Sequence, residues 1–296
     1  MRALVLSGGA SKGAYQVGVL KHLMGDLEAH YDLICGVSVG AINGAWLSMF
    51  PEGQEKPCIE QLENLWRGLS TKDVYVSWVN LPGFLRYLGF LVAPFKSSIY
   101  NSKPIEELLK EKFDPKLIEK SGKQLKIGAV SLSSGLYKLF DQDHPEIVKA
   151  VAASAAFPTA FSPVEIDGEF WLDGGIKEVT PLKAAIQAGA TEIDIVITAS
   201  SKRRPKNYTE APKLFTLAPR VLSLMSDEVL DNDVNRALEL NDLIKEGAVV
   251  PGKRYIPMRV FRPEQSLTPN SLKFEQKYIA PMIDKGYEVA QKVTGQ

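Results

Sequence analysis

Ser38 is the residue of this chain whose setting best suits covalent chemistry. It is the centre of the segment Gly36-Val37-Ser38-Val39-Gly40, with a short apolar run before it, residues 31–35, and a helix-compatible run after it, residues 41–47. A serine at such a strand-turn-helix junction projects its hydroxyl from a sharp turn that has no room for β-carbons two residues either side. Because G-x-S-x-G arises by chance about one time in ten in a chain of this length, the assignment depends on partners elsewhere.

A nucleophilic serine needs a base, and the chain offers three histidines, His22, His30 and His144. Two of them precede Ser38, whereas an α/β-hydrolase triad runs in the order serine, acid, histidine. His144 follows Ser38 with aspartates between them, so chain order allows a triad. Pro145 comes next, however, and suits the first turn of a helix over residues 146–152. We therefore interpret His144 as a helix-entry residue.

Asp173 is the alternative base, a carboxylate at a predicted strand end. Residues 163–172 alternate apolar and polar side chains around Asp167-Gly168, which favours a hairpin with a two-residue type I′ turn. The second strand leads to Asp173, and Gly174-Gly175 lets the backbone turn sharply while another segment approaches the carboxylate. An ordinary aspartate in a glycine-rich turn has the same spacing. The two interpretations stay open on spacing alone.

A glycine-rich loop, residues 7–13, follows the first apolar run of the chain and leads into an apolar stretch at helical spacing, residues 14–23. Loops that open a helix in this way gather unpaired backbone N–H groups around an anion. A Walker loop needs lysine where this chain has Ala14, and no G-x-G-x-x-G register fits. The loop therefore predicts an anion hole without a nucleotide signature, as the tetrahedral intermediate of acyl transfer requires.

Together these segments resemble the patatin-like phospholipase family. Its patterns G-G-[GA]-x-[RK]-G, G-x-S-x-G, A-S-x-A-x-P and D-G-[GA] occur in family order at residues 8–13, 36–40, 153–158 and 173–175. The resemblance extends over residues 1 to about 200. One departure is Thr180, which precedes a proline where many members carry asparagine. The resemblance implies a three-layer α/β/α sandwich around a mostly parallel central sheet, with Ser38 and Asp173 as a catalytic dyad.

The mechanism that this resemblance implies is a two-step acyl transfer. Asp173 takes the proton of Ser38, the alkoxide attacks an ester carbonyl, and water then releases the acyl group. The expected oxyanion hole consists of backbone N–H groups of Gly8, Gly9, Ala10 and Val39. Because an unperturbed aspartate has a pKa of about 3.9, Asp173 must lie in a poorly solvated pocket to act as a base. We expect no metal or other cofactor, and Lys12 is a candidate headgroup contact.

The leading functional hypothesis is a serine lipid acyl hydrolase of the phospholipase A or lysophospholipase type, acting on phospholipid or another acyl ester. One alternative is an acyltransferase with the same dyad; malonyl transacylases have an elbow serine but depend on a histidine base. A second is a catalytically silent module that binds lipid or a partner, although binding alone needs no such constellation. Headgroup, acyl chain, sn-position, oligomeric state and any activating partner remain open.

Composition favours one catalytic domain, residues 1–296, with residues 74–100 as a lid or interfacial insertion. The chain has 45% hydrophobic residues, and its 35 basic and 35 acidic residues argue against nucleic acid as a partner. Cys35 and Cys58 make no disulfide framework, and Cys35 falls in the predicted strand before Ser38. The first apolar run is shorter than the ~7–15 residues of a signal-peptide core. No run reaches the ~18 apolar residues of a membrane span, so we expect a cytoplasmic protein with transient contact at a membrane surface.

Four further segments are informative. Residues 78–95 are rich in aromatics with few basic residues, which suits a membrane interface, a lid or a completed core. Residues 202–206 form a basic cluster, interpreted as a solvated loop, with anionic headgroup binding as the alternative. A strand near residues 255–261 and a helix over 271–292 are predicted to end the chain.

An amphipathic helix is predicted over residues 220–245. We expect core packing to explain all of its apolar positions, which are Leu222, Met225, Val229, Leu230, Val234, Leu238 and Leu243.

Overall fold

The computed structural model describes residues 1–77, 97–202 and 214–295. The aromatic segment 78–95 and most of the basic cluster 202–206 lie outside the described residues. The main sheet of the described part has eight strands: β1 (Arg2–Leu6), β2 (Leu33–Gly36), β5 (Gln124–Ser131), β6 (Tyr137–Asp141), β7 (Val164–Ile166), β8 (Glu169–Asp173), β9 (Glu192–Val196) and β10 (Met258–Phe261). Two short strands, β3 (Val76–Ser77) and β4 (Tyr100–Asn101), form a separate antiparallel pair.

The strand order of the main sheet is β10-β9-β1-β2-β5-β8-β7, with β6 also paired to β5. The neighbours from β10 to β5 are parallel, whereas β6 and β8 both run antiparallel to β5. The sheet is therefore mixed and mostly parallel, as the resemblance implied.

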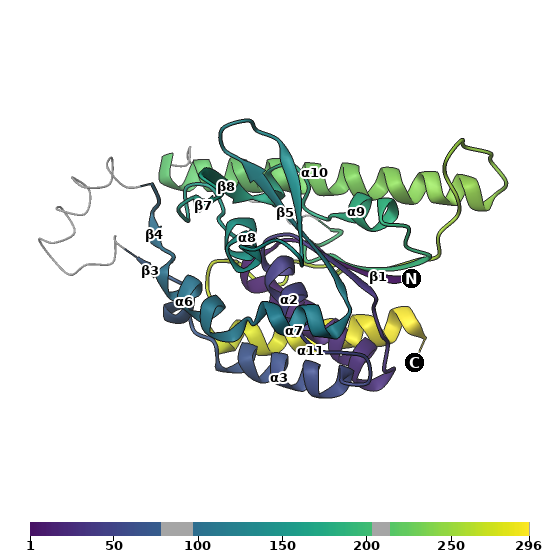
Figure 1. Cartoon of the computed structure of the whole chain (residues 1–296), viewed down its shortest axis with the longest axis horizontal. Helices are drawn as coiled ribbons and strands as arrows, with labels where there is room; N and C mark the ends of the chain where they lie inside the picture. The colour runs from purple at the N-terminus through teal and green to yellow at the C-terminus, as the bar shows by residue number, and fades with distance from the viewer. Residues whose placement is uncertain (78–96, 203–213, 296) are drawn as a thin grey trace, which may run out of the picture.

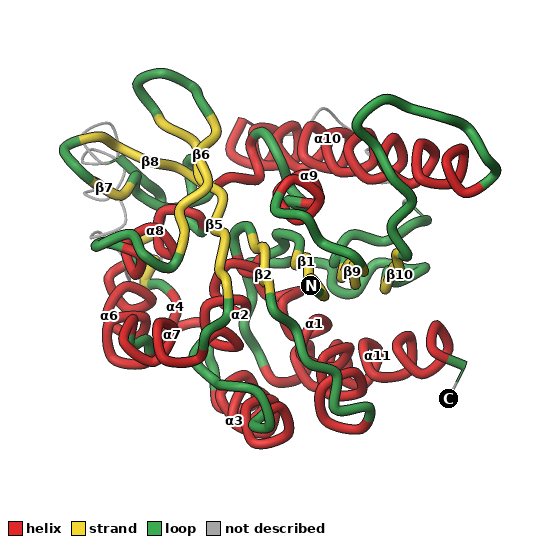
Figure 2. The backbone as a smooth tube through the Cα atoms, turned by 45° about the vertical axis from the view of Figure 1, so that its right-hand side comes forward, coloured by secondary structure: helices red, strands yellow, loops and turns green. Residues whose placement is uncertain are grey.

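Helices cover both faces of this sheet (Figures 1 and 2). One face carries α1 (Gly13–Leu20), α2 (Val39–Ser48), α3 (Glu55–Gly68), α4 (Thr71–Val74), α6 (Lys103–Lys112), α7 (Pro115–Ser121), α8 (Ile147–Ser154) and α11 (Gln276–Thr294). The other face carries α9 (Leu182–Gln187) and α10 (Leu214–Lys245). Alternate strand side chains supply the two cores: Leu4 and Leu6 belong to the first, Ala3 and Val5 to the second. The three-layer α/β/α sandwich is confirmed.

Several local predictions are confirmed and others need new boundaries. Asp167 and Gly168 both have positive φ, 51° and 77°, as a type I′ hairpin turn requires. The final helix begins at Gln276, after residues 271–275, here called the strap. The strap begins with a turn in which the Lys273 N–H donates to the Asn270 carbonyl, and the carbonyl of Leu272 accepts a hydrogen bond from Tyr75. The last strand begins at Met258, where its pairing with β9 starts. No helix in the described part of the chain combines the length and apolar character needed to cross a membrane.

Strand β5 determines where the ends of β2 and β8 lie. β2 pairs with residues 124–127 of β5, β8 pairs with residues 129–131, and β6 pairs with residues 126–130. Because both β2 and β8 share paired residues of β5 with β6, both must lie along the edge opposite β6. β8 therefore pairs with the part of this edge of β5 that lies beyond the end of β2.

The register along that edge sets the separation of two sequence-distant turns. Gly36 at the end of β2 pairs with Ile127, and Asp173 at the end of β8 pairs with Ala129. The two partners are two residues apart on β5, which corresponds to about 6–7 Å along a strand. The turn that holds Ser38 therefore begins beside the end of β8.

Candidate active site

Ser38 lies at the turn between β2 and α2 with φ 56° and ψ −127°, outside the common regions for a residue with a side chain. The flanking glycines are required by the packing of this turn. A β-carbon on Gly36 would collide with the carbonyl of Gly40, and one on Gly40 would collide with the carbonyl of Leu6. The backbone at Ser38 therefore forms the sharp turn that the sequence predicts.

The backbone of the elbow is tied to α8 through Ser154. The Ser38 N–H donates to Ser154 Oγ at 2.9 Å, and the Ser154 hydroxyl donates to the carbonyl of Gly128 at 2.6 Å. Ser154 is fully buried. The sequence reasoning included it in the A-S-x-A-x-P segment without a role; its signal was a polar side chain in the otherwise apolar run 150–157. Ser154 thus links the elbow to β5.

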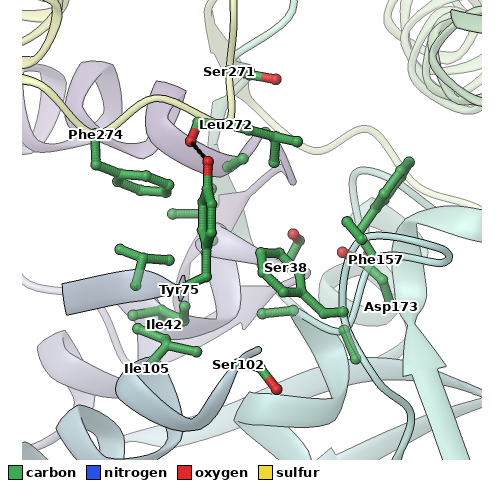
Figure 3. A pocket seen from close by; sticks show the side chains of 18 of the residues that line it. Ser38, Ile42, Tyr75, Ser102, Ile105, Phe157, Asp173, Ser271, Leu272 and Phe274 are labelled. Atoms are coloured by element: carbon green, nitrogen blue, oxygen red, sulfur yellow. Dashed lines mark hydrogen bonds between the residues drawn. The ribbon is translucent and has the colours of Figure 1, made fainter. Parts of the chain in front are cut away.

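Asp173 is buried, with 2% of its surface exposed, and lies next to Ser38 (Figure 3). Gly175 N–H donates to its Oδ1 at 2.8 Å. Burial raises the pKa of Asp173 to about 7, although the Gly175 N–H and the nearby Ser38 side chain both act to lower it. A carboxylate with this pKa can accept a proton near neutral pH.

The glycine-rich loop and the elbow both contribute residues to the lining of the same cavity. Gly9 caps the short 3-10 helix Ala10–Lys12, and Val39 is the first residue of α2. The N–H groups of Ala10 and Val39 therefore lie in first helical turns, where no intrahelical carbonyl is available to them. Gly9, Ala10 and Val39 all line the cavity that holds Ser38 and Asp173.

Gly8 differs from the sequence expectation. Its N–H donates to the carbonyl of Val179 at 3.0 Å, and its own carbonyl accepts a hydrogen bond from the Thr198 hydroxyl. The N–H of Gly8 is therefore already used within the fold and is not available to an oxyanion. Gly8 instead gives close packing, since a β-carbon there would lie 3.2 Å from Cβ of Ser38.

Lys12 also lines the cavity. Burial lowers the pKa of Lys12, and the nearby Asp227 of α10 acts in the opposite direction. Lys12 is thus an amine of reduced basicity in the glycine-rich loop, near Asp227 of α10.

The three histidines lie outside this arrangement, and the described residues that line the cavity include none of them. His144 contacts Asp167 through Nε2 at 3.2 Å, and its Nδ1 accepts the N–H of Glu146 at 3.2 Å, one residue before α8. The helix-entry interpretation of His144 agrees with these contacts. His22 is hydrogen-bonded to Asp26 and Thr294, and His30 to Glu55.

The cavity has a volume of about 1880 Å³ in the described part of the chain. That exceeds the ~300–1,000 Å³ of a typical small-molecule site. Its apolar lining residues include Ile42, Leu62, Leu69, Tyr75, Ile105, Leu109 and Phe161. Its polar lining residues include Lys12, Ser223, Ser226, Asp227, Asn270 and Ser271. The strap residues Leu272 and Phe274 also line the cavity, where Tyr75 is hydrogen-bonded to the Leu272 carbonyl (Figure 3).

A three-layer α/β/α fold with a serine elbow and a buried aspartate at one large cavity defines the class of protein. The family model of patatin-like phospholipases matches residues 4–186, which is more than half of the chain and includes all four motifs. The chain belongs to the patatin-like phospholipase family.

A relative from Pseudomonas aeruginosa (strain BWHPSA011 / Pa011), named cGAMP-activated phospholipase, is 28% identical over 187 residues. The match covers 58% of this chain and 52% of the relative, so it spans about half of that protein. VipD from Legionella pneumophila has 14% identity and a TM-score of 0.45, covering 99% of this chain and 66% of that structure. The type III effector protein ExoU has 12% identity and a TM-score of 0.33, covering 100% of this chain and 53% of that structure.

Proposed function

We propose that this protein is a serine lipid acyl hydrolase of the phospholipase A or lysophospholipase type, with Ser38 as nucleophile and Asp173 as base. Family membership supports a lipid acyl hydrolase in general terms. The observation that carries the finer assignment is the pairing of a strained elbow serine with a buried aspartate whose pKa is raised to about 7.

In the proposed first step, Asp173 accepts the proton of the Ser38 hydroxyl as the oxygen attacks the ester carbonyl. The negative charge that develops on the carbonyl oxygen is stabilised by N–H groups of Gly9, Ala10 and Val39, which line the cavity beside Ser38. Collapse of the tetrahedral intermediate breaks the ester bond. Asp173 then returns the proton to the leaving alcohol, and Ser38 carries the acyl group.

In the second step, water attacks the acyl-enzyme. Asp173 takes a proton from the water, the same N–H groups hold the second oxyanion, and the fatty acid leaves as Ser38 recovers its proton. The raised pKa of Asp173 suits both directions of proton transfer, because the base strength and the acid strength are balanced near neutral pH. The apolar lining residues of the cavity would contact an acyl chain, and the polar lining residues would contact the rest of the lipid.

The test is product analysis on defined lipids. Purified protein is incubated with mixed phospholipid and lysophospholipid vesicles, with and without cGAMP because one relative is named for activation by it, and the products are identified by mass spectrometry. We expect free fatty acid from the wild-type protein and none from Ser38→Ala. Acyl transfer to an added alcohol in preference to water would identify a transferase. Equal product from Ser38→Ala would contradict the proposal.

A further inference from the structure

The N-terminal half of α10 carries an apolar stripe that faces outward. Leu217, Val221, Leu224 and Met225 are 40%, 43%, 42% and 60% exposed. Their spacing of four, three and one residues places them on one face of an α-helix. The sequence prediction that core packing explains all of these apolar positions is therefore wrong at Met225, because this part of the helix has its apolar face away from the core. It is also wrong at Leu243, which is 54% exposed near the other end of the helix.

The opposite face of the same helical turns lines the catalytic cavity. Ser223, Ser226, Asp227 and Leu230 follow one another at spacings of three, one and three residues and all line the cavity that contains Ser38. Three of these four side chains are polar. At 100° per residue, the centre of this stripe lies roughly opposite the centre of the outward one. The amphipathic order of a normal surface helix is thus reversed in this segment.

The C-terminal half of α10 has the usual orientation and serves as an internal comparison. Leu230 and Val234 are 2% and 1% exposed and belong to the core under the sheet face that α10 covers. Asn241 is also buried and exchanges hydrogen bonds with the backbone of Ile256 at 2.9 Å. Leu243 is an isolated exposed apolar side chain in this half. The contiguous outward stripe lies at the end of the helix that borders the cavity.

We propose that the outward stripe of α10 is a docking surface for a phospholipid bilayer, lying in the interface with its apolar side chains among the acyl chains. This inference rests on the proposed function, because the cavity on the inner side of the helix is taken to hold lipid esters. A bilayer on the outer stripe brings headgroups to the polar inner stripe and to Lys12 beside Asp227. One helix then connects the membrane surface to the site of ester cleavage.

A bilayer suits this surface better than a second copy of the chain. A stable protein interface needs about 20–30 residues on each side, whereas the stripe consists of four side chains on one helix. An interfacial helix needs only one apolar face of this width, with a polar face opposite it. The exposed apolar face and the cavity-lining polar face of α10 together match that pattern.

The experiment measures vesicle binding in the Ser38→Ala background, so that hydrolysis does not alter the membrane. Full-length protein is floated with vesicles of phosphatidylcholine and phosphatidylglycerol in equal parts. The test variant is Val221→Ser/Leu224→Ser/Met225→Ser. The matched control is Leu243→Ser, a residue 54% exposed on the same helix and about 27 Å further along its axis. We expect vesicle affinity to fall about 100-fold in the triple variant and to stay unchanged in the control.

Each alternative result overturns the proposal. It fails if the wild-type surface does not bind vesicles, if the triple variant binds as well as its parent, or if Leu243→Ser loses as much affinity. It also fails if the triple variant only converts a dimer into a monomer in light scattering while vesicle affinity is unchanged. If the triple variant does not fold, the single variant Met225→Ser is measured in its place. We expect its vesicle affinity to fall about 5-fold, and an unchanged affinity would overturn the proposal.

A separate measurement keeps the two proposals distinguishable. The same α10 variants with Ser38 intact are assayed on a short soluble ester, where we expect wild-type turnover because no membrane is involved. If the wild-type protein cleaves neither the ester nor lipid, the proposed function fails while the vesicle measurement still stands. A loss of soluble-ester turnover in the triple variant equal to its loss of vesicle affinity would assign the stripe to folding and overturn the docking surface.

Discussion

Ser38 donates its backbone N–H to the hydroxyl oxygen of Ser154 at 2.9 Å, and this bond joins the strained elbow to a different helix. Ser154 in turn donates to the carbonyl of Gly128 on β5, the strand whose other residues pair with β2 and β8. Contacts with β5 therefore position both the elbow and the end of β8, where Asp173 lies. A positive φ at a residue with a β-carbon persists only when its surroundings hold it, and Ser154 is part of what holds it.

Replacing Ser154 tests its positioning role. Ser154→Ala leaves the partly buried N–H of Ser38 without its partner, which costs about 1 kcal/mol of unfolding free energy. We expect kcat on a soluble ester to fall about 10- to 100-fold with little change in KM, because the nucleophile is misplaced while the cavity is intact. Ser154→Cys, which keeps a weak acceptor, should recover part of kcat. A loss of stability with unchanged kcat would mean that Ser154 only supports the fold.

Covalent labelling tests the nucleophile. A fluorophosphonate probe should modify Ser38 alone, because it is the serine at the elbow beside the backbone donors of Gly9 and Ala10. Mass spectrometry of peptides identifies the labelled residue. Ser102 lines the same cavity without an elbow, so Ser102→Ala is the control and should label like wild type. Undiminished labelling of Ser38→Ala would remove the assignment.

Asp173→Asn tests the base. The amide keeps the shape of the side chain but cannot accept a proton, and we expect turnover to fall about 10²–10⁴-fold. His144→Ala should stay within a few-fold of wild type, since His144 contacts Asp167 and Glu146 instead of the cavity. Steady-state kinetics on one soluble ester compares the two. A collapse of His144→Ala to the level of Asp173→Asn would restore a histidine-based triad.

The pH profile should report the titration of Asp173. Its pKa is raised to about 7 by burial, and only the deprotonated form accepts the Ser38 proton. We therefore expect kcat/KM to rise with pH through about 7 and to level off above it. Rates are measured from pH 5 to pH 9 in buffers of equal ionic strength. An activity plateau that already begins near pH 5 would show that the base titrates elsewhere.

The same raised pKa predicts how stability changes with pH. Well below pH 3.8 Asp173 is protonated in both the folded and the unfolded protein, so its burial does not require a charged group to lose its hydration. Between its ordinary value of 3.8 and about 7 the unfolded form ionises first, and stability falls as pH rises, by about 4 kcal/mol in total.

Asp173→Asn lacks this ionisation. Its unfolding free energy relative to wild type should therefore increase between pH 4 and pH 8, as measured by urea unfolding. A difference between the two proteins that does not vary with pH would contradict the raised pKa.

The sequence by itself determined the features that depend on neighbouring residues. The elbow, the type I′ turn at Asp167-Gly168 and the strand that contains Cys35 follow from glycine positions and apolar periodicity. The family motifs identified Ser38 and Asp173 as candidates, and their local backbone is as expected. The roles of residues 78–95 stay predictions, since that segment lies outside the described residues.

Only the tertiary structure decided which groups face one another. β8 lies beside β5 past the end of β2, and this arrangement brings Asp173 to Ser38, although the two residues are more than 130 positions apart in the chain. The N–H of Gly8 is taken by Val179, and the apolar side chain of Met225 faces outward. Such partners are distant in the chain, whereas the local pattern records only which residues share a face or a turn. The hydrogen bond of Gly8 and the direction of the α10 stripe therefore depended on how the helices and strands pack.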